Sequence, residues 1–283
     1  MKFGYFGINF GPCSSPEAMA RVARALESAG FESAWTGEHV VLPDPQAPPS
    51  PAPPHTRMLD PAVALTWVAA HTERLRLGTG IIILPQRNPA VLAKEIASLD
   101  VLSGGRAILG IGAGYLEPEF AALGVPFARR GARADEYIDA MRALWTEEKP
   151  SYAGEFVSFA GIDAQPRPVQ VGGPPIVVGG TSAGAYRRAV SRGHGWYGFA
   201  LDVANTEASL AGLERARREV DRPAELGELE ISITPLPGID ADSVKRYADL
   251  GVDRLTLLTL PRTVEDVLAF VDEAATKLLP AAP

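Results

Sequence analysis

Two side chains able to exchange protons end one apolar segment near the start of this sequence. The segment Trp35-Thr-Gly-Glu-His39 has the character of a buried strand and finishes with Glu38 and His39. An imidazole titrates near neutral pH, so His39 can give or take a proton or hydrogen-bond the carbonyl of a bound ring. A histidine with a purely structural role is the alternative. We predict Glu38 and His39 as catalytic residues.

A glycine-rich turn, Gly-Gly-Thr-Ser at 179–182, precedes a helix predicted over residues 183–192. Backbone N–H groups and hydroxyls at a helix N-terminus suit an anion such as a phosphate group. The alternative is an ordinary turn with a Ser or Thr cap. The segment Gly110-Ile-Gly-Ala-Gly114 has the spacing of a nucleotide loop, but no matching acidic residue follows it. We interpret it as backbone that lies close to a ligand.

Two reaction classes are disfavoured by what the predicted strand ends lack. A Schiff-base aldolase needs a lysine at a strand end, whereas the lysines here open a strand or lie on helices and in a loop. The four histidines are scattered, so we predict no metal site. Cys13 is the only cysteine, which excludes an internal disulfide. What remains is glycine, backbone amide and apolar side chain, and such a site suits a large, flat, partly anionic cofactor.

Eight apolar, β-rich segments alternate with helical patterns and would position these residues. They are Lys2–Phe10, Ser33–Gly37, Leu75–Leu84, Arg106–Gly112, Ile176–Gly180, Gly195–Ala200, Leu229–Pro235 and Arg254–Leu260. Strands that alternate with helices indicate parallel βαβ units, and eight units close into a (β/α)8 TIM barrel of typically about 250 residues. We expect one barrel domain over residues 1–283, with its site at the C-terminal ends of the strands.

Helix starts and long loops complete the expected architecture. Three helices begin with an oxygen-bearing cap followed by proline, at Ser15-Pro16, Asp60-Pro61 and Asn88-Pro89. Three segments exceed ordinary barrel loops, namely Pro43–Leu59, Tyr115–Gly131 and Lys149–Pro175. The first is too rich in proline to be helix or central strand, and because it follows a strand at the mouth we predict a lid. A disordered linker is the alternative.

Composition limits the partners. The chain has a formal net charge of −7 and no long basic run, which disfavours a surface that binds nucleic acid. No segment approaches the roughly 18 unbroken apolar residues that a membrane span needs. The N-terminal segment lacks a cleavage site and is interpreted as a first strand, so we expect a cytoplasmic protein with a small-molecule ligand.

Five motifs, in this order and spacing, resemble the bacterial luciferase-like family in its F420-dependent oxidoreductase branch. They are Trp35-Thr-Gly-Glu-His39, Arg74-Leu-Arg-Leu-Gly-Thr-Gly80, Arg87-Asn-Pro89, Leu99-Asp-Val-Leu-Ser-Gly-Gly-Arg106 and Gly110-Ile-Gly-Ala-Gly114. The resemblance covers most of the chain and is thinner after Ala200. It departs at His194, where relatives commonly have Asp, and in the proline-rich loop, and both departures bear on the substrate.

The resemblance implies that F420 or FMN binds at the barrel mouth of a protein that is usually a homodimer. It places a non-prolyl cis peptide, matching Gly80-Ile81, behind the cofactor ring, a histidine matching His39 beside the ring, and the cofactor phosphate at the turn 179–182. The predicted cofactor contacts are Asn9, His39, Gly80, Ile81, Gly112, Ala113, Gly114, Gly179, Gly180, Thr181, Ser182 and Trp196. For Trp35 and Trp196 a place in the core is the favoured alternative.

The predicted function is an F420-dependent oxidoreductase that transfers hydride between the deazaflavin and an organic substrate. An FMN-dependent monooxygenase, a non-catalytic cofactor-binding protein and a phosphosugar isomerase are the alternatives. The anionic part of the cofactor would lie near Arg129, Arg130, Arg187 and Arg188, unless these arginines form ordinary solvated surface. The sequence does not identify the substrate.

Overall fold

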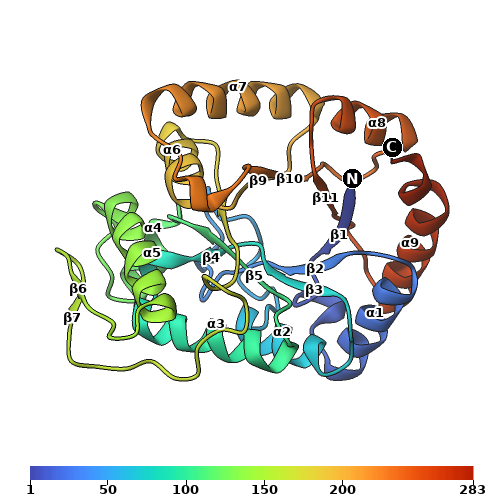
Figure 1. Cartoon of the computed structure of the whole chain (residues 1–283). Helices are drawn as coiled ribbons and strands as arrows, with labels where there is room; N and C mark the ends of the chain where they lie inside the picture. Colours follow the sequence, from blue (N-terminus) through green and yellow to red (C-terminus); the bar gives the residue numbers. More distant parts are fainter. Residues whose placement is uncertain (283) are drawn as a thin grey trace.

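A ring of helices surrounds a central barrel of parallel strands in the computed structural model, which describes residues 1–282 (Figure 1). Strands adjacent along the chain pair in parallel, and the last pairs back onto the first, so the sheet closes. The strands are β1 (Lys2–Phe6), β2 (Ser33–Thr36), β3 (Arg76–Thr79), β4 (Ile82–Ile83), β5 (Ala107–Gly112), β8 (Ile176–Gly179), β9 (Gly195–Phe199), β10 (Glu230–Thr234) and β11 (Arg254–Leu257). The predicted (β/α)8 barrel is confirmed, with β3 and β4 as the two halves of its third strand.

The helices that cover the barrel follow their strands in chain order. They are α1 (Pro16–Ser28), α2 (Pro61–Ala69), α3 (Pro89–Ser103), α5 (Arg130–Thr146), α6 (Ala183–Arg192), α7 (Val203–Glu219), α8 (Ala241–Asp249) and α9 (Val264–Lys277). The three proline-led starts are confirmed, because Ser15, Asp60 and Asn88 each accept a hydrogen bond from a backbone N–H of the first turn. In the part of the chain that the structure describes, no helix is long and apolar enough to cross a bilayer.

Aromatic side chains fill the inside of the barrel. The rings of Trp35 and Tyr197 stack at 5.5 Å between centroids with an interplanar angle of 8°. Both residues are buried, together with Phe6, Ile108 and Val177. A Cβ atom on Gly78 would lie 2.4 Å from the Trp35 ring, so only glycine leaves room for the indole here. The preference for Trp35 as a core residue is confirmed.

A buried cluster of ion pairs closes the N-terminal end of the barrel. Arg254 is fully buried and pairs with Glu32 at 2.9 Å and with Glu230, while its guanidinium lies 5.5 Å from the centroid of the Trp35 ring. A buried arginine is tolerated only when its donors are satisfied, as they are here. A ligand therefore has access to the barrel only from the opposite end.

His194 also lies at the closed end, at the start of β9. Its Nδ1 accepts a hydrogen bond from the Ile176 N–H at 3.0 Å. Burial, together with the nearby guanidiniums of Arg142 and Arg222, lowers the pKa of His194 to about 4. The expectation that this departure bears on the substrate is wrong, because the side chain is at the end of the barrel away from the mouth.

We expect His194 to make folding depend on pH. The folded chain favours the neutral ring, so its contribution is complete above pH 6.5 and is lost as the pH falls towards 4, where the unfolded chain takes up the proton. Because the ring is only partly buried, we expect a loss of about 1 to 2 kcal/mol after solvent screening. Denaturant unfolding at pH 6.5 and at pH 4 measures this loss. The free energy of unfolding should fall less between the two pH values for His194→Asn than for the native protein. The exposed His55→Asn should leave the native difference intact.

The third strand contains a β-bulge that separates β3 from β4. Gly78 pairs with Ile108 and Ile82 with Ile111, so residues 79–81 lie opposite residues 109 and 110 only. The Thr79 hydroxyl fills the gap in the ladder, since it donates to the Gly110 carbonyl at 2.7 Å and accepts from the Gly110 N–H at 2.8 Å. The continuous strand predicted over Leu75–Leu84 is corrected at this point.

Replacing Thr79 with valine keeps the shape of the side chain but leaves both polar groups of Gly110 unpaired. A buried unpaired donor or acceptor costs about 1 to 3 kcal/mol, and we expect a loss of that size in the free energy of unfolding. Thr79→Ser retains the hydroxyl and should cost less. Urea unfolding of the two variants compares them directly, and equal losses would rule out the hydroxyl as the link across the bulge.

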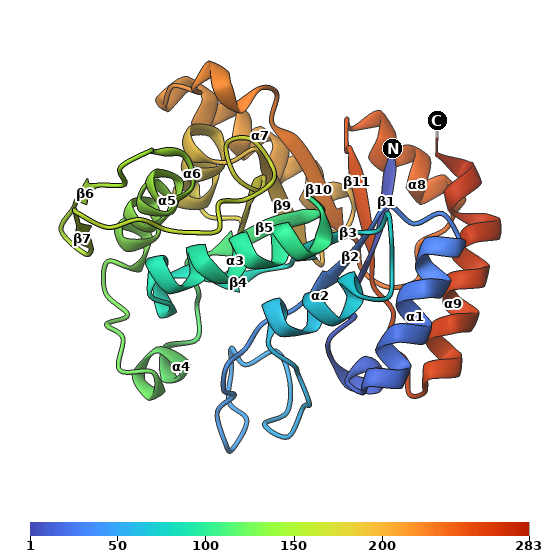
Figure 2. The ribbon, with the colours of Figure 1, turned by 60° about the horizontal axis from the view of Figure 1, so that its bottom comes forward.

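Two of the three long loops carry secondary structure that the sequence did not predict. Tyr115–Gly131 contains the helix α4 (Glu117–Ala122), and Lys149–Pro175 contains the antiparallel hairpin of β6 (Tyr152–Ala153) and β7 (Ser158–Phe159). The proline-rich loop has neither helix nor named strand, as expected, and one bridge, from Met58 to Phe10, pairs it with the segment that follows β1. This loop and α4 project from the same end of the barrel (Figure 2).

Candidate functional site

Three glycines on β5 and β8 leave a hollow in the barrel mouth that the side chain of Ile81 enters. A Cβ atom on Gly112 would lie 1.9 Å from the Ile81 Cδ1, and one on Gly179 would lie 3.1 Å from the Ile81 Cγ2. Gly110 also faces Ile81, at 3.5 Å. The Gly80–Ile81 peptide is cis, which confirms the prediction from the resemblance. Ile81 is partly exposed and forms an apolar floor at this side of the mouth.

His39 follows β2 and is held by Glu119 of the unpredicted helix α4. Its Nδ1 lies 3.2 Å from the Glu119 Oε2, and the Glu119 side chain is completely buried. The other Glu119 oxygen accepts from the Val40 N–H at 2.6 Å. Because an ionised carboxylate can only accept, this contact needs a proton on Nδ1, and in the neutral ring Nε2 is then the acceptor. Nε2 lies 3.4 Å from the hydroxyl of Tyr115, which is half exposed at the mouth.

Glu38 precedes His39 in the chain, but its side chain is buried away from solvent. Its carboxylate accepts from the Ile83 N–H at 2.5 Å and from the guanidinium of Arg87, which also binds Asp60 at 2.8 Å. Burial acts to lower the pKa of Arg87, but the carboxylates of Glu38 and Asp60 outweigh it and raise that pKa. We correct the assignment of Glu38 as catalytic, because its oxygens are committed to joining β2 to β4. It is a positioning residue.

The turn at 179–182 lies at the rim of the mouth and is largely open. Gly180 has a φ of +116°, a backbone conformation that favours glycine, and Thr181 and Ser182 are exposed. The Ser182 hydroxyl caps α6 by accepting from the Ala185 N–H at 3.2 Å. The capping alternative is therefore present. The Gly180 N–H donates to the Tyr197 carbonyl at 3.4 Å, so an anion would have to meet the N–H groups at the start of α6. An anion at this turn stays a prediction.

The chain is similar to known proteins over most of its length. A family model described as luciferase-like monooxygenase matches residues 1–269. The chain belongs to this luciferase-like family. It is thereby an oxidoreductase or monooxygenase by class, as predicted.

Two relatives are similar to this chain over most of its length. An uncharacterised protein of Mycobacterium tuberculosis is 34% identical over 267 residues, which cover 92% of this chain and 93% of the relative. An F420-dependent glucose-6-phosphate dehydrogenase of Kineococcus radiotolerans is 31% identical over 254 residues, which cover 84% of this chain and 70% of the relative.

Two solved structures share the luciferase-like fold over nearly their full length. A coenzyme F420-dependent tetrahydromethanopterin reductase of Methanopyrus kandleri has a TM-score of 0.80, 17% identity and full coverage of both chains. The monooxygenase RslO1 of Streptomyces bottropensis has a TM-score of 0.78, 23% identity and 99% coverage of both. At these identities the likeness concerns the fold.

Two of the predicted cofactor contacts use their polar groups for hydrogen bonds within the chain. Asn9 is fully buried, donates to the carbonyls of Gly37 and Leu59 and accepts from the Gly37 N–H, so its amide is saturated. Trp196 is also fully buried, and its indole N–H donates to the Gly180 carbonyl at 2.8 Å. We correct both to supporting roles, Asn9 for the loop after β2 and Trp196 for the turn at the rim.

The four arginines suggested for an anionic cofactor tail all have partners within the chain. Arg129 pairs with Glu155, Arg187 with Glu219 and Arg188 with Asp135, while the Arg130 Nε donates to the Gly114 carbonyl at 2.9 Å. The Arg130 contact holds the backbone after β5, near Ala113. The ordinary alternative of structural or solvated charge fits these residues better.

Sequence reasoning missed the two side chains that hold His39. Tyr115 and Glu119 lie in a segment expected to be loop, yet Glu117-Pro118-Glu119 places acidic residues and a proline in one helical first turn. That pattern is itself a helix start and could have indicated α4. Their contact with His39 joins residues about 80 positions apart, and no local pattern reports it.

The opposite rim of the mouth is apolar. Phe199 ends β9, Leu236 and Leu260 follow β10 and β11, and all three are exposed. The ring of Phe199 lies 4.9 Å from that of Phe6 between centroids. A hollow of about 200 Å³ lies between the ends of β1 and β11, beside Phe10 and Leu260. Within residues 1–282 no group of three His, Cys, Asp or Glu side chains is arranged to hold a metal ion.

Proposed function

We propose that this luciferase-like protein is an F420-dependent oxidoreductase that transfers hydride between the deazaflavin and a small organic substrate. The observation that carries the proposal is the apolar floor of Ile81 set into Gly110, Gly112 and Gly179, at the same mouth as a histidine fixed by a buried carboxylate. The similarity to the F420-dependent glucose-6-phosphate dehydrogenase over most of the chain supports this cofactor.

The mouth fits a flat ring with an anionic extension. Residues 112–114 offer backbone without bulky side chains, Ile81 offers an apolar surface, and the turn at 179–182 offers N–H groups and hydroxyls. When bound, F420 supplies the carbon centre that accepts or donates hydride. The residues around it orient the ring and limit the access of water.

His39 is placed to handle the proton that accompanies hydride transfer to or from a hydroxyl or carbonyl. With Nδ1 directed to Glu119, its Nε2 can accept a proton from the direction of Tyr115 and the mouth. Glu119 holds the ring orientation and balances the charge of a protonated imidazole. The apolar rim at Phe199 and Leu260 favours a substrate with an apolar portion.

Fluorescence titration of the purified protein with oxidised F420 and with FMN tests the cofactor. We expect saturable binding of F420 and weaker binding of FMN. Tight FMN binding without F420 binding would support the second candidate, an FMN-dependent monooxygenase, in line with the description of the family. Anaerobic assays with glucose 6-phosphate and with secondary alcohols then test turnover, and binding without turnover of any substrate would favour a cofactor-binding protein.

We also propose a homodimer through the outer faces of α2 and α3, which pack beside each other (Figure 2). Val63 and Trp67 on α2, and Val91 and Leu102 on α3, are large apolar side chains left exposed. Val91→Glu combined with Leu102→Glu should shift the mass measured by light scattering from dimer to monomer. Val171→Glu, on an exposed loop, should leave it unchanged. A native protein that is monomeric would contradict the proposal.

A further inference from the structure

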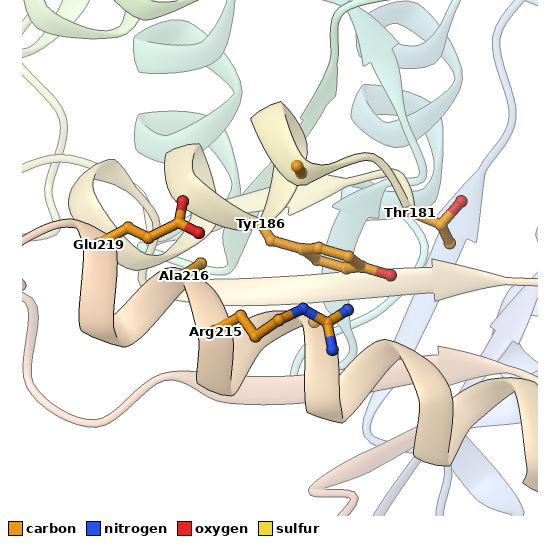
Figure 3. Close-up of a pocket in the computed structure, with 7 residues that line it drawn as sticks. Thr181, Tyr186, Arg215, Ala216 and Glu219 are labelled. Carbon is orange, nitrogen blue, oxygen red and sulfur yellow. The ribbon is translucent and has the colours of Figure 1, made fainter.

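A pocket of about 180 Å³ lies on the outside of the barrel, between α6 and α7 (Figure 3). Thr181, Tyr186 and Arg215 line it together with Gly212 and Glu219. Thr181 also belongs to the exposed turn at the rim of the mouth. The pocket thus shares Thr181 with the predicted phosphate site, and its other lining side chains come from α6 and α7.

Tyr186 is the unusual residue in this pocket. The residue is only 8% exposed, and no group of residues 1–282 makes a hydrogen bond with its hydroxyl. Figure 3 shows the ring extending along the pocket, with the hydroxyl on the same side as the Arg215 guanidinium and towards Thr181. The hydroxyl is not sealed within the protein but opens into the pocket, where it is available to a ligand.

The neighbouring helix accommodates the Tyr186 ring at a specific position. A Cβ atom on Gly212 would lie 2.3 Å from the Tyr186 Cε2, so only glycine allows the ring to lie against α7. Glycine inside a helix costs about 1 kcal/mol relative to alanine. On its other side the ring packs near Trp196, at 5.8 Å between centroids, and Trp196 binds the Gly180 carbonyl. The tyrosine is therefore held in place and connected to the turn.

The pocket contains a guanidinium that no carboxylate of the described chain neutralises. Arg215 has no ion-pair partner in the described part of the chain, whereas the carboxylate of Glu219 is occupied by Arg187 at 3.0 Å. The first turn of α6 contributes Ala183 to the lining, and N–H groups at a helix start have no intrahelical partner. A free guanidinium, a free hydroxyl and a helix N-terminus all favour a negatively charged group with several acceptor atoms.

We propose that the α6–α7 pocket is an anion site, separate from the mouth, that binds a carboxylate or phosphate group. Arg215 provides the charge and the Tyr186 hydroxyl donates a hydrogen bond. The anion has two possible sources, a free phosphate ion or an acidic group of the cofactor that reaches over Thr181. The second source rests on the proposed function, and the first does not.

Calorimetric titration of the cofactor-free protein with inorganic phosphate, at constant ionic strength, tests the site. We expect Arg215→Gln to weaken phosphate binding about tenfold or more and Tyr186→Phe about threefold to tenfold. Arg217→Gln is the matched control, since it removes the same charge from the opposite face of α7, and it should change binding less than about twofold. Phosphate bound at the mouth alone would leave all three variants equal to the native protein, and that result, or no binding, would overturn the proposal.

A second titration separates the two sources. If the anion belongs to the cofactor, Arg215→Gln lowers the affinity for F420 and phosphate competes with F420. If the anion is free, phosphate and F420 bind together and the affinity for F420 is unchanged. Both results support the site, provided that phosphate binding depends on Arg215. Failure of F420 to bind at all would contradict the proposed function while leaving the phosphate titration to decide on the pocket. Thermal unfolding of Tyr186→Phe checks that the fold is intact.

Discussion

Replacing His39 with alanine is expected to lower turnover about 10²- to 10⁴-fold while the affinity for F420 changes little. That range is the usual contribution of a proton-transferring side chain placed beside the reacting atoms. The imidazole is suited to this role because Glu119 fixes it through Nδ1 and its Nε2 is directed to Tyr115 and the mouth. Single-turnover hydride transfer, followed by the absorbance of F420, and fluorescence titration measure the two quantities separately.

Two further measurements distinguish proton transfer from mere support of the fold. Imidazole added to the solution should restore part of the turnover of His39→Ala, because the side chain leaves a space of that size. Glu119→Gln should reduce turnover by a smaller factor, about tenfold, since the ring is retained but less firmly held. Turnover of His39→Ala equal to that of the native enzyme would exclude His39 from the reaction.

Replacing Gly110 with alanine is expected to lower the free energy of unfolding by about 3 kcal/mol or more. Its Cβ atom would lie 1.8 Å from the backbone oxygen of Thr79, which cannot move without opening the bulge between β3 and β5. Gly112, two residues further along the same strand, gives the matched comparison. Its Cβ atom would meet only the terminal methyl group of Ile81, at 1.9 Å.

The two glycines should therefore affect different properties. Gly112→Ala can be accommodated by a new rotamer of Ile81, so we expect a stability loss of about 1 kcal/mol or less but an affinity for F420 reduced about tenfold. Combining Gly112→Ala with Ile81→Ala removes the clash and should recover little affinity, because the apolar floor is then missing. Denaturant unfolding and fluorescence titration give the two readings, and equal stability losses at positions 110 and 112 would refute the distinction.

Several features of the fold could be predicted from local sequence because they depend on local chemistry. Proline after Asp60 or Asn88 has the right dihedral angle for a helix start, and the preceding side chain caps the free N–H groups. The alternation of apolar strands with helices specifies parallel βαβ units, so the barrel and the position of its mouth follow from the pattern alone. His39 and the turn at 179–182 were located by the same rule, as residues at strand ends.

What the sequence could not specify was the use of each side chain within the mouth. Glu38 and His39 are adjacent in the chain, but Arg87 occupies one and Glu119 orients the other, and both partners come from distant segments. The free hydroxyl of Tyr186 likewise depends on a glycine 26 residues away on α7, at position 212. Local propensity and strand-end position determine where chemistry can occur, because they act within one element. Tertiary packing decides which groups remain free to perform this chemistry. Their hydrogen-bond partners and the atoms that exclude them come from elements that meet only in the closed barrel.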